Sequence, residues 1–134
     1  NVMLEGILLK PNMILPGLTC AKQNDLDTIA QATYQCFLRT VPAAVPGIAF
    51  LSGGQSPELA SERLNAMNVK FKGKLPWGVG FSYSRAILEP ALEIWQGKEA
   101  NVQAAQKVLY HRAKCNSAAR AGLYHAEMEK KEDE

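Results

Sequence analysis

Three short apolar-rich runs, separated by stretches of helical periodicity, constrain the fold of this chain more than any other feature. The runs cover residues 4–9, 48–51 and 78–83, so their starts lie about 30 to 45 residues apart, which is the spacing of βα units. Apolar runs of this length, bounded by breakers or polar residues, are typical of strands in parallel sheets. The order strand, helix, strand, helix, strand, helix, helix therefore predicts an α/β fold.

Periodic apolar positions between and after these runs predict four helices. A side-chain oxygen at the N-cap accepts one of the first backbone N–H groups of a helix, and Asp25 and Ser56 stand at such positions. Pro57 follows Ser56 directly and is favourable in a first helical turn. The predicted helices cover residues 26–40, 57–67, 87–95 and 101–122. We also expect the large aromatic residues of and around the third strand and its helix to lie in the core, namely Trp77, Phe81, Tyr83 and Trp95.

The predicted sheet is incomplete as an independent unit. Three strands leave two open edges, and 134 residues fall well short of the roughly 250 that a full eight-unit α/β barrel needs. We expect residues 1–126 to form the folded part of the chain. Residues 127–134 hold five acidic residues and two lysines, so we expect a solvated, disordered tail.

Composition argues against several classes of partner. The net charge of +2 is too small to indicate binding to nucleic acid or to an anionic membrane. No apolar stretch approaches the roughly 20 residues of a membrane-spanning helix, and no targeting signal is visible, which would also be true if a presequence had been removed. Three cysteines at irregular spacing favour buried thiols in a reducing compartment over a disulfide framework.

His111 and Cys115 are the one pair in the sequence that invites a metal-site interpretation. They lie four residues apart on the last predicted helix, which can place them on one face. The alternative is a half-exposed helical histidine beside a buried thiol. We favour that alternative because a second pair of ligands is missing nearby.

Polar residues follow each of the three predicted strands. In parallel α/β folds, ligands gather at the carboxyl ends of the strands. Three polar strand ends in succession therefore predict a ligand site along one rim of the sheet. The residues concerned are Lys10, then Ser52 with Gly53 and Gly54, and finally the segment from Ser82 to Arg85.

Lys10 ends the first apolar run, and Pro11 after it cannot donate to a strand ladder. Burial of a lysine at this point would favour its neutral, nucleophilic amine, which condenses with ketones to form a Schiff base. The alternative is a lysine that turns outward into water. From this stretch alone, the outward-turned lysine is the more common arrangement.

The Ser52-Gly53-Gly54 segment joins the second strand to a helix and has the residues of an anion-binding turn. Glycines let backbone N–H groups approach an anion, and the helix N-terminus adds positive potential. The alternative is a tight turn that needs glycine for geometry alone. Arg85 favours the first interpretation because its planar fork can bind two phosphate oxygens, although it can also pair with Glu89 one helical turn later.

Five segments distributed over nearly the whole chain have a distinctive sequence: LEGILLKPNM at 4–13, VPAAVPGIAFLSGGQS at 41–56, LNAMN at 64–68, FSYSRAIL at 81–88 and RAKCNSA at 112–118. Together they resemble the class I fructose-1,6-bisphosphate aldolases. The resemblance implies a TIM-type (β/α)₈ barrel, of which this chain would be about the last three βα units plus the C-terminal helices.

The resemblance also implies roles for individual residues. Lys10 would attack the C2 ketone of a sugar phosphate and form the Schiff base. The C1 phosphate would be held by Ser52, Gly53, Gly54 and Arg85, and Ser82 would be a further substrate contact. Class I aldolases need no metal or other cofactor, and their acid/base residues lie on upstream strands that this chain does not contain.

Two hypotheses follow from the sequence. In the first, the chain is the C-terminal portion of a glycolytic or Calvin-cycle aldolase of the cytoplasm or plastid stroma. Its partners would be sugar phosphates, the missing N-terminal portion and other copies in a homotetramer. In the second, it is a non-catalytic, aldolase-like structural or interaction subunit of a larger assembly. We favour the first because Lys10, Ser52 and Arg85 are all present.

Overall fold

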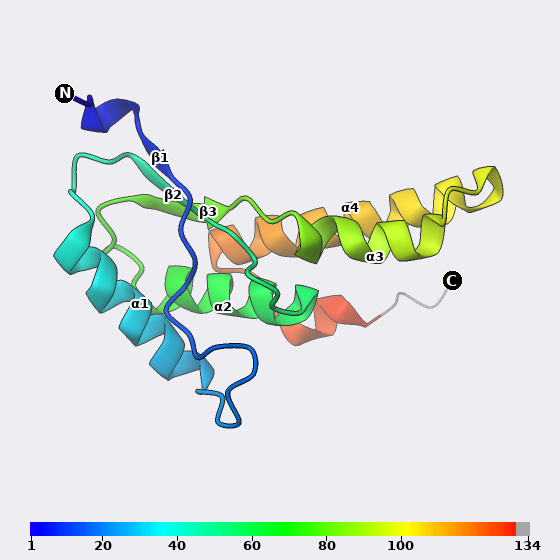
Figure 1. Ribbon diagram of the computed structural model, residues 1–134, viewed down its shortest axis with the longest axis horizontal. Coiled ribbons are helices and arrows are strands. Elements are labelled where there is room, and N and C mark those ends of the chain that lie inside the picture. Colours follow the sequence, from blue (N-terminus) through cyan, green and yellow to red (C-terminus); the bar gives the residue numbers. More distant parts are fainter. Residues whose placement is uncertain (131–134) are drawn as a thin grey trace.

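The computed structural model describes residues 1–130 (Figure 1). The strands are β1 (Leu8–Leu9), β2 (Gly47–Phe50) and β3 (Gly78–Phe81). The α-helices are α1 (Leu26–Thr40), α2 (Pro57–Lys70), α3 (Arg85–Trp95) and α4 (Val102–Ala121). Short 3-10 helices are η1 (Leu4–Gly6), η2 (Glu99–Asn101) and η3 (Ala126–Glu129). In the part of the chain that the structure describes, no helix has the length and apolarity needed to cross a bilayer.

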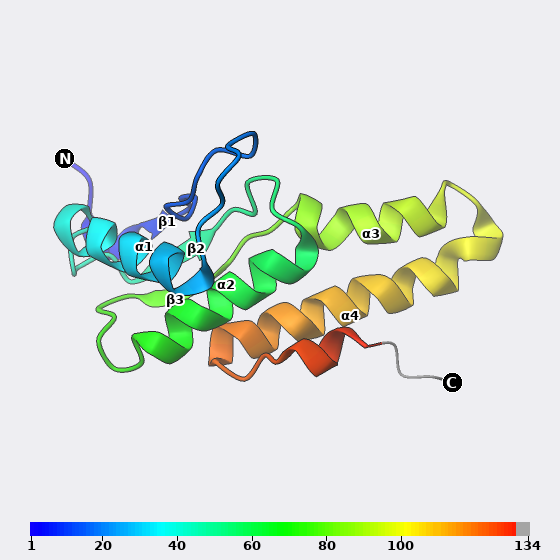
Figure 2. The same ribbon diagram turned by 90° about the horizontal axis from the view of Figure 1, so that it is seen from below.

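The three strands form a parallel sheet in the order β1-β2-β3. Leu8 pairs with Gly47, and Gly47 pairs in turn with Gly78. Figures 1 and 2 show α1 and α2 on the same side of the sheet. The predicted α/β fold with a parallel sheet is confirmed.

The first predicted strand is much shorter than expected. Only Leu8 and Leu9 pair with β2, while residues 4–6 form the 3-10 helix η1. Because Leu8 already lies opposite Gly47, the residues before it extend past the start of β2. They have no ladder partner there, since the chain before Gly47 is a proline-containing turn closed by the hydrogen bond from Val45 to the carbonyl of Pro42.

The predicted helix starts are confirmed where a capping side chain is present. The Asp25 side chain accepts from the N–H of Thr28 at 2.7 Å, and Ser56 accepts from the N–H of Leu59 at 3.3 Å. The second helix continues to Lys70, three residues beyond the expected end. The third begins two residues early, which leaves Pro90 inside α3.

The core lies between the sheet and helices α1 and α2. Phe50 of β2 is fully buried, and its ring centroid lies 5.7 Å from that of Phe37 on α1. Trp77 packs edge-on against Phe37, and its indole N–H donates to the carbonyl of Pro42 at 3.0 Å. Tyr83 is buried, with its hydroxyl donating to the carbonyl of Ala60 at 2.9 Å. The expected core positions of Trp77 and Tyr83 are confirmed.

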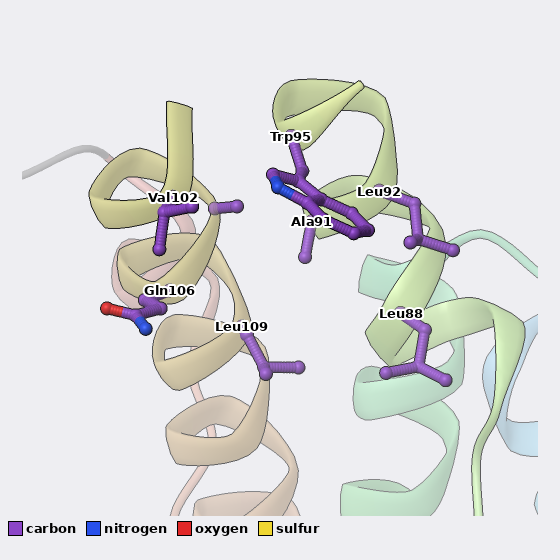
Figure 3. A pocket seen from close by; sticks show the side chains of 8 residues that line it. Leu88, Ala91, Leu92, Trp95, Val102, Gln106 and Leu109 are labelled. Carbon is purple, nitrogen blue, oxygen red and sulfur yellow. The ribbon is translucent and has the colours of Figure 1, made fainter. Parts of the chain in front are cut away.

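Trp95, which we also expected in the core, is 42% exposed. Helices α3 and α4 lie side by side and extend beyond the sheet as a hairpin (Figure 1). Trp95 lines an apolar groove of about 290 Å³ between these two helices (Figure 3). The prediction was wrong because apolar periodicity reports one face of a helix but not whether that face reaches the sheet.

The three cysteines differ in their surroundings. Cys115 is fully buried, Cys36 is half-buried and Cys20 is exposed in the loop between β1 and α1. Burial raises the pKa of the Cys115 thiol, and the nearby Glu129 carboxylate raises it further. The expectation of buried thiols therefore holds for Cys115 and fails for Cys20.

The acidic end of the chain differs from the solvated tail that we expected from residue 127 onward. Residues 126–129 form η3, which follows α4 and lies beside it (Figure 2). Glu129 anchors this segment to α4 through contacts described below. The last four predicted tail residues, 131–134, lie outside the described residues.

Candidate functional site

The carboxyl ends of the three strands lie side by side along one rim of the sheet. The N–H of Leu51 donates to the carbonyl of Pro11 at 3.0 Å, and the N–H of Ser82 donates to the carbonyl of Phe50 at 2.8 Å. These bonds continue the β1–β2 and β2–β3 ladders past the ends of the strands. Lys10, Ser52 and Ser82 therefore follow neighbouring strands at the same rim, as the topology predicts.

The turn after β2 and the start of α3 come together at this rim. Gly53 and Gly54 have φ angles of 61° and 82°, in the left-handed region that favours glycine. A Cβ placed on Gly54 would lie 3.8 and 3.9 Å from the two terminal nitrogens of Arg85. Helix α2 begins at Pro57, three residues after Gly54, so its positive end lies close to this turn. The arrangement suits a phosphate group.

The loop that follows β1 packs directly on this turn. A Cβ on Gly53 would lie 2.8 Å from Nδ2 of Asn12, and a Cβ on Gly54 would lie 2.8 Å from Cδ1 of Leu18. A side chain at either glycine would strain the backbone and would have to displace the end of the Asn12 or Leu18 side chain. Asn12 and Leu18 join the segment after Lys10 to the turn, and the sequence analysis did not identify them.

The predicted site residues differ in exposure. Ser52 is buried, whereas Lys10, Ser82 and Arg85 are exposed. Of the two arrangements considered for Lys10, the structure therefore has the lysine that turns outward into water. The physical reason is that β1 has no neighbour on its outer side within residues 1–130, so no second surface covers the lysine.

Comparison with known proteins decides the family. The family model for fructose-bisphosphate aldolase class-I matches residues 1–134. This chain belongs to the class I fructose-bisphosphate aldolase family. It is 52% identical over 124 residues to fructose-bisphosphate aldolase 4, cytosolic, from Arabidopsis thaliana, which covers 92% of this chain and 31% of that relative. It is 51% identical over 132 residues to fructose-bisphosphate aldolase 1, chloroplastic, from Chlamydomonas reinhardtii, which covers 98% and 34%.

A solved structure is similar as well. It is a ternary co-crystal structure of fructose-bisphosphate aldolase from Plasmodium falciparum with TRAP and a small-molecule inhibitor, at a TM-score of 0.87 and 46% identity. The match covers 93% of this chain and 35% of that chain. The aldolase chain described here therefore spans about a third of the length of its relatives.

These matches explain why the sheet is open. The predicted fold, about the last three βα units of a TIM barrel with C-terminal helices, agrees with the similarity to an aldolase structure over a third of its length. In a closed barrel each strand has a neighbour on both sides. The exposed outer edge of β1 therefore reflects the part of the barrel that this chain does not contain.

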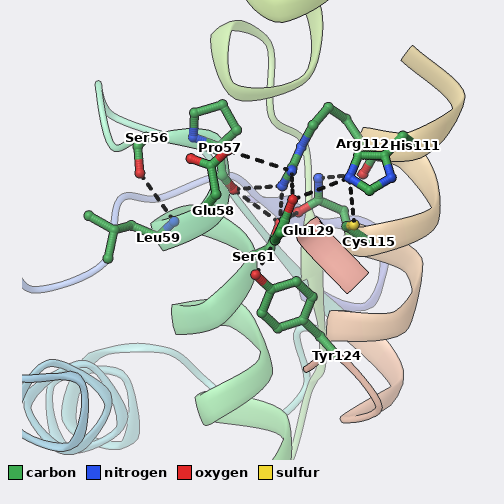
Figure 4. Close-up of polar contacts among 11 residues, drawn as sticks. Ser56, Pro57, Glu58, Leu59, Ser61, His111, Arg112, Cys115, Tyr124 and Glu129 are labelled. Atoms are coloured by element: carbon green, nitrogen blue, oxygen red, sulfur yellow. Dashed lines mark hydrogen bonds and ion pairs between the residues drawn. The ribbon is translucent and has the colours of Figure 1, made fainter. Parts of the chain in front are cut away.

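A second polar cluster ties α4 to the N-terminal end of α2 (Figure 4). Arg112 is 3% exposed, and its Nη2 donates to the carbonyl of Pro57 at 2.9 Å and to Oγ of Ser61 at 2.8 Å. Its Nη1 donates to the Glu129 carboxylate. Oγ of Ser61 also donates to Oδ1 of Asn116 at 2.9 Å. The cluster thus fixes the N-terminal end of α2, which directly follows the turn that contains Gly53 and Gly54.

Glu129 is the point at which η3 joins this cluster. Its carboxylate accepts from the Tyr124 hydroxyl at 2.9 Å and lies 3.2 Å from Nε2 of His111, in addition to Arg112. Burial alone would raise the pKa of Glu129. The hydrogen bonds from Arg112, His111 and Tyr124 outweigh that effect and hold the pKa below its ordinary value.

The pair that invited a metal interpretation lies within the same cluster. Nε2 of His111 is 3.6 Å from Sγ of Cys115, and with Glu129 the three ligand atoms lie within 4.8 Å of one another. The Arg112 guanidinium binds the same carboxylate and would repel a cation placed there. His111 is half-buried, which matches the alternative that we favoured.

Two buried arginines had no predicted role, although the sequence placed them on apolar helix faces. Arg63 and Arg112 both lie on the buried faces of their helices, among positions such as Leu64 and Cys115. A charged residue on an apolar face requires a polar partner. The position of each arginine therefore indicated a buried polar network. The partners, Gln55 for Arg63 and Glu129 for Arg112, could be identified only from the three-dimensional structure.

We expect η3 to detach in acid because the pKa of Glu129 is lowered in the folded state. A carboxylate of this kind contributes stability above its ordinary pKa of 4.5, and the contribution is lost as the pH falls through the lower folded value. Hydrogen exchange of residues 124–129, compared at pH 6 and pH 3 with the E129Q variant, measures this. Protection that exceeds that of E129Q equally at both pH values would contradict the prediction.

Proposed function

We propose that this chain is the C-terminal part of a fructose-bisphosphate aldolase that cleaves or forms fructose 1,6-bisphosphate through a lysine Schiff base. The observation that carries the proposal is the meeting of the Gly53-Gly54 turn with Arg85 at the rim where the strand before Lys10 also ends. A phosphate cradle and an amine on neighbouring strands are what a ketose phosphate requires. Identity of about 50% to named aldolases supports the same activity.

In this proposal Lys10 supplies the covalent chemistry. Its neutral Nζ adds to the C2 carbonyl carbon of the substrate, and loss of water gives a protonated imine. The imine accepts the electron pair of the C3–C4 bond as that bond breaks, while a base on the upstream strands takes the proton of the C4 hydroxyl, which releases glyceraldehyde 3-phosphate. Protonation at C3 and hydrolysis of the imine then release dihydroxyacetone phosphate and restore the lysine.

The turn after β2 holds the substrate in this proposal. Ser52, Gly53 and Gly54 bind the C1 phosphate with Arg85, whose exposed fork can donate two parallel hydrogen bonds to phosphate oxygens. Ser82 contacts the substrate from the end of the next strand. Holding the phosphate fixes the position of C2 relative to Lys10, and such positioning contributes much of the rate of a bimolecular step.

The complete enzyme would act on sugar phosphates in glycolysis or the Calvin cycle, in the cytoplasm or the plastid stroma. Relatives named cytosolic and chloroplastic support these two compartments. A homotetramer remains part of the proposal by resemblance alone. We do not favour the alternative of a non-catalytic subunit, because the polar ends of the three strands are all retained.

A chimera tests the proposal directly. The N-terminal part of the Arabidopsis cytosolic relative, ending where the match begins, is joined to Asn1 of this chain. We expect the chimera to cleave fructose 1,6-bisphosphate and the 134-residue chain alone to show no turnover above background. The chain alone lacks the upstream acid/base groups, so proximity catalysis is lost.

The same relative with its own C-terminal part serves as the positive control. A folded chimera without activity would refute the proposed function. Turnover by the purified chain alone would show instead that the upstream strands are not needed.

A further inference from the structure

Two buried polar side chains, Gln55 and Arg63, support the glycine turn, which is the segment Ser52-Gly53-Gly54 after β2. Nη1 of Arg63 donates to Oε1 of Gln55 at 2.9 Å. Nε2 of Gln55 donates to the carbonyl of Ser52 at 3.0 Å, and the backbone N–H of Gln55 donates to the same carbonyl at 3.1 Å. A continuous chain of hydrogen bonds therefore runs from α2 to the first residue of the turn.

These hydrogen bonds from Arg63 through Gln55 to Ser52, called the bridge below, have a fixed direction of donation. A guanidinium can only donate, so the oxygen of the Gln55 side chain must face Arg63 and its NH₂ group must face the turn. Gln55 and Arg63 are 7% and 8% exposed, so water competes little for these bonds.

Burial of the charged Arg63 side chain is unfavourable unless hydrogen bonds compensate for its lost hydration. Desolvation lowers the pKa of this arginine, although the neighbouring Glu62 partly offsets that effect. Arg63 lies beside Leu64, which is fully buried, on a helix face where an apolar side chain would pack without such a cost. The hydrogen bond to Gln55 is what the structure gains in return.

We propose that Arg63 is a positioning residue for substrate phosphate, acting through Gln55 to hold the Ser52-Gly53-Gly54 turn in its binding conformation. This inference rests on the proposed function, because it takes the turn to be the phosphate site. Two successive glycines have more backbone freedom than any other pair. A turn that is already ordered loses less entropy when the phosphate binds, and the affinity rises accordingly.

The kinetic test uses the chimera with three variants. Arg63→Met keeps the aliphatic bulk but removes the donor, and Gln55→Glu keeps an acceptor for Arg63 but removes the donor to Ser52. For both we expect the KM for fructose 1,6-bisphosphate to rise about tenfold, the effect of one buried hydrogen bond, while kcat changes by less than about twofold. Arg39→Met is the matched control, because Arg39 is exposed on α1, and should leave both constants unchanged.

A conservative variant and a double variant separate positioning from general stability. Arg63→Lys keeps one donor, and we expect it to recover most of the lost affinity. Arg63→Met combined with Gln55→Glu should raise KM no further than either change alone, since both break one chain of bonds. An unchanged KM in folded Arg63→Met, or additive effects in the double variant, would overturn the inference.

Hydrogen exchange in the 134-residue chain tests the bridge without catalysis. We expect the Gln55 amide hydrogen, which is bonded to Ser52, to exchange about tenfold faster in Arg63→Met than in Arg39→Met. Unchanged exchange would refute the positioning role. Faster exchange together with an inactive parent chimera would leave the positioning role standing and would refute the proposed function instead.

Discussion

Replacing Lys10 with arginine in the chimera is expected to lower kcat by at least about a thousandfold. Arginine keeps the positive charge and much of the length, but its guanidinium stays protonated and cannot form an imine. Without the imine, no group accepts the electron pair of the C3–C4 bond, so cleavage loses its covalent catalysis. The measurement is the steady-state rate of fructose 1,6-bisphosphate cleavage.

Chemical trapping gives the same prediction an independent readout. Borohydride reduction of the chimera with dihydroxyacetone phosphate should leave a stable adduct on the peptide that contains Lys10, identified by mass spectrometry. Lys74→Arg is the control, because Lys74 lies just before β3, at the opposite end of the strands. An adduct absent from Lys10 in an active chimera would rule out this lysine as the Schiff-base residue.

Replacing Arg112 with methionine is expected to lower the free energy of unfolding by about 3 kcal/mol, as for other broken buried ion pairs. The change removes the donors to Pro57, Ser61 and Glu129 at once. It leaves the Glu129 carboxylate, whose side chain is only 18% exposed, without its cationic partner. Urea denaturation of the chain, followed by the fluorescence of its two tryptophans, Trp77 and Trp95, measures the difference.

A matched variant on the same helix gives the baseline for that loss. Lys114 is exposed on α4, so Lys114→Met should change the free energy of unfolding by less than about 0.5 kcal/mol. A loss below about 1 kcal/mol in Arg112→Met would show that the cluster contributes little to stability. The network would then serve only to place η3.

Local chemistry made parts of this fold predictable from the sequence. The caps at Asp25 and Ser56 depend on neighbouring residues only, and the structure has both. The length of β1 depends instead on where β2 begins, which no local pattern reports. Trp95 was misplaced for a similar reason, since its helix continues past the sheet.

The candidate site also has features that the sequence predicts and features that depend on the three-dimensional structure. Topology alone predicts that the residues after parallel strands share a rim, and the ladders past Pro11 and Phe50 agree with this. The two alternatives for Lys10 stayed open in the sequence, because its burial depends on whether another strand covers the outer side of β1. Gln55 and Glu129 were missed because each acts through a partner whose identity only the folded chain reveals.

The exposed thiol of Cys20 makes this chain convenient for attaching a fluorescent dye. Cys115 is fully buried with a raised pKa, and Cys36 is half-buried, so alkylating reagents reach the exposed Cys20 first. A dye at that position sits two residues from Leu18, whose methyl group lies against Gly54. Fluorescence of a dye on this natural cysteine can therefore report conformational changes of the glycine turn.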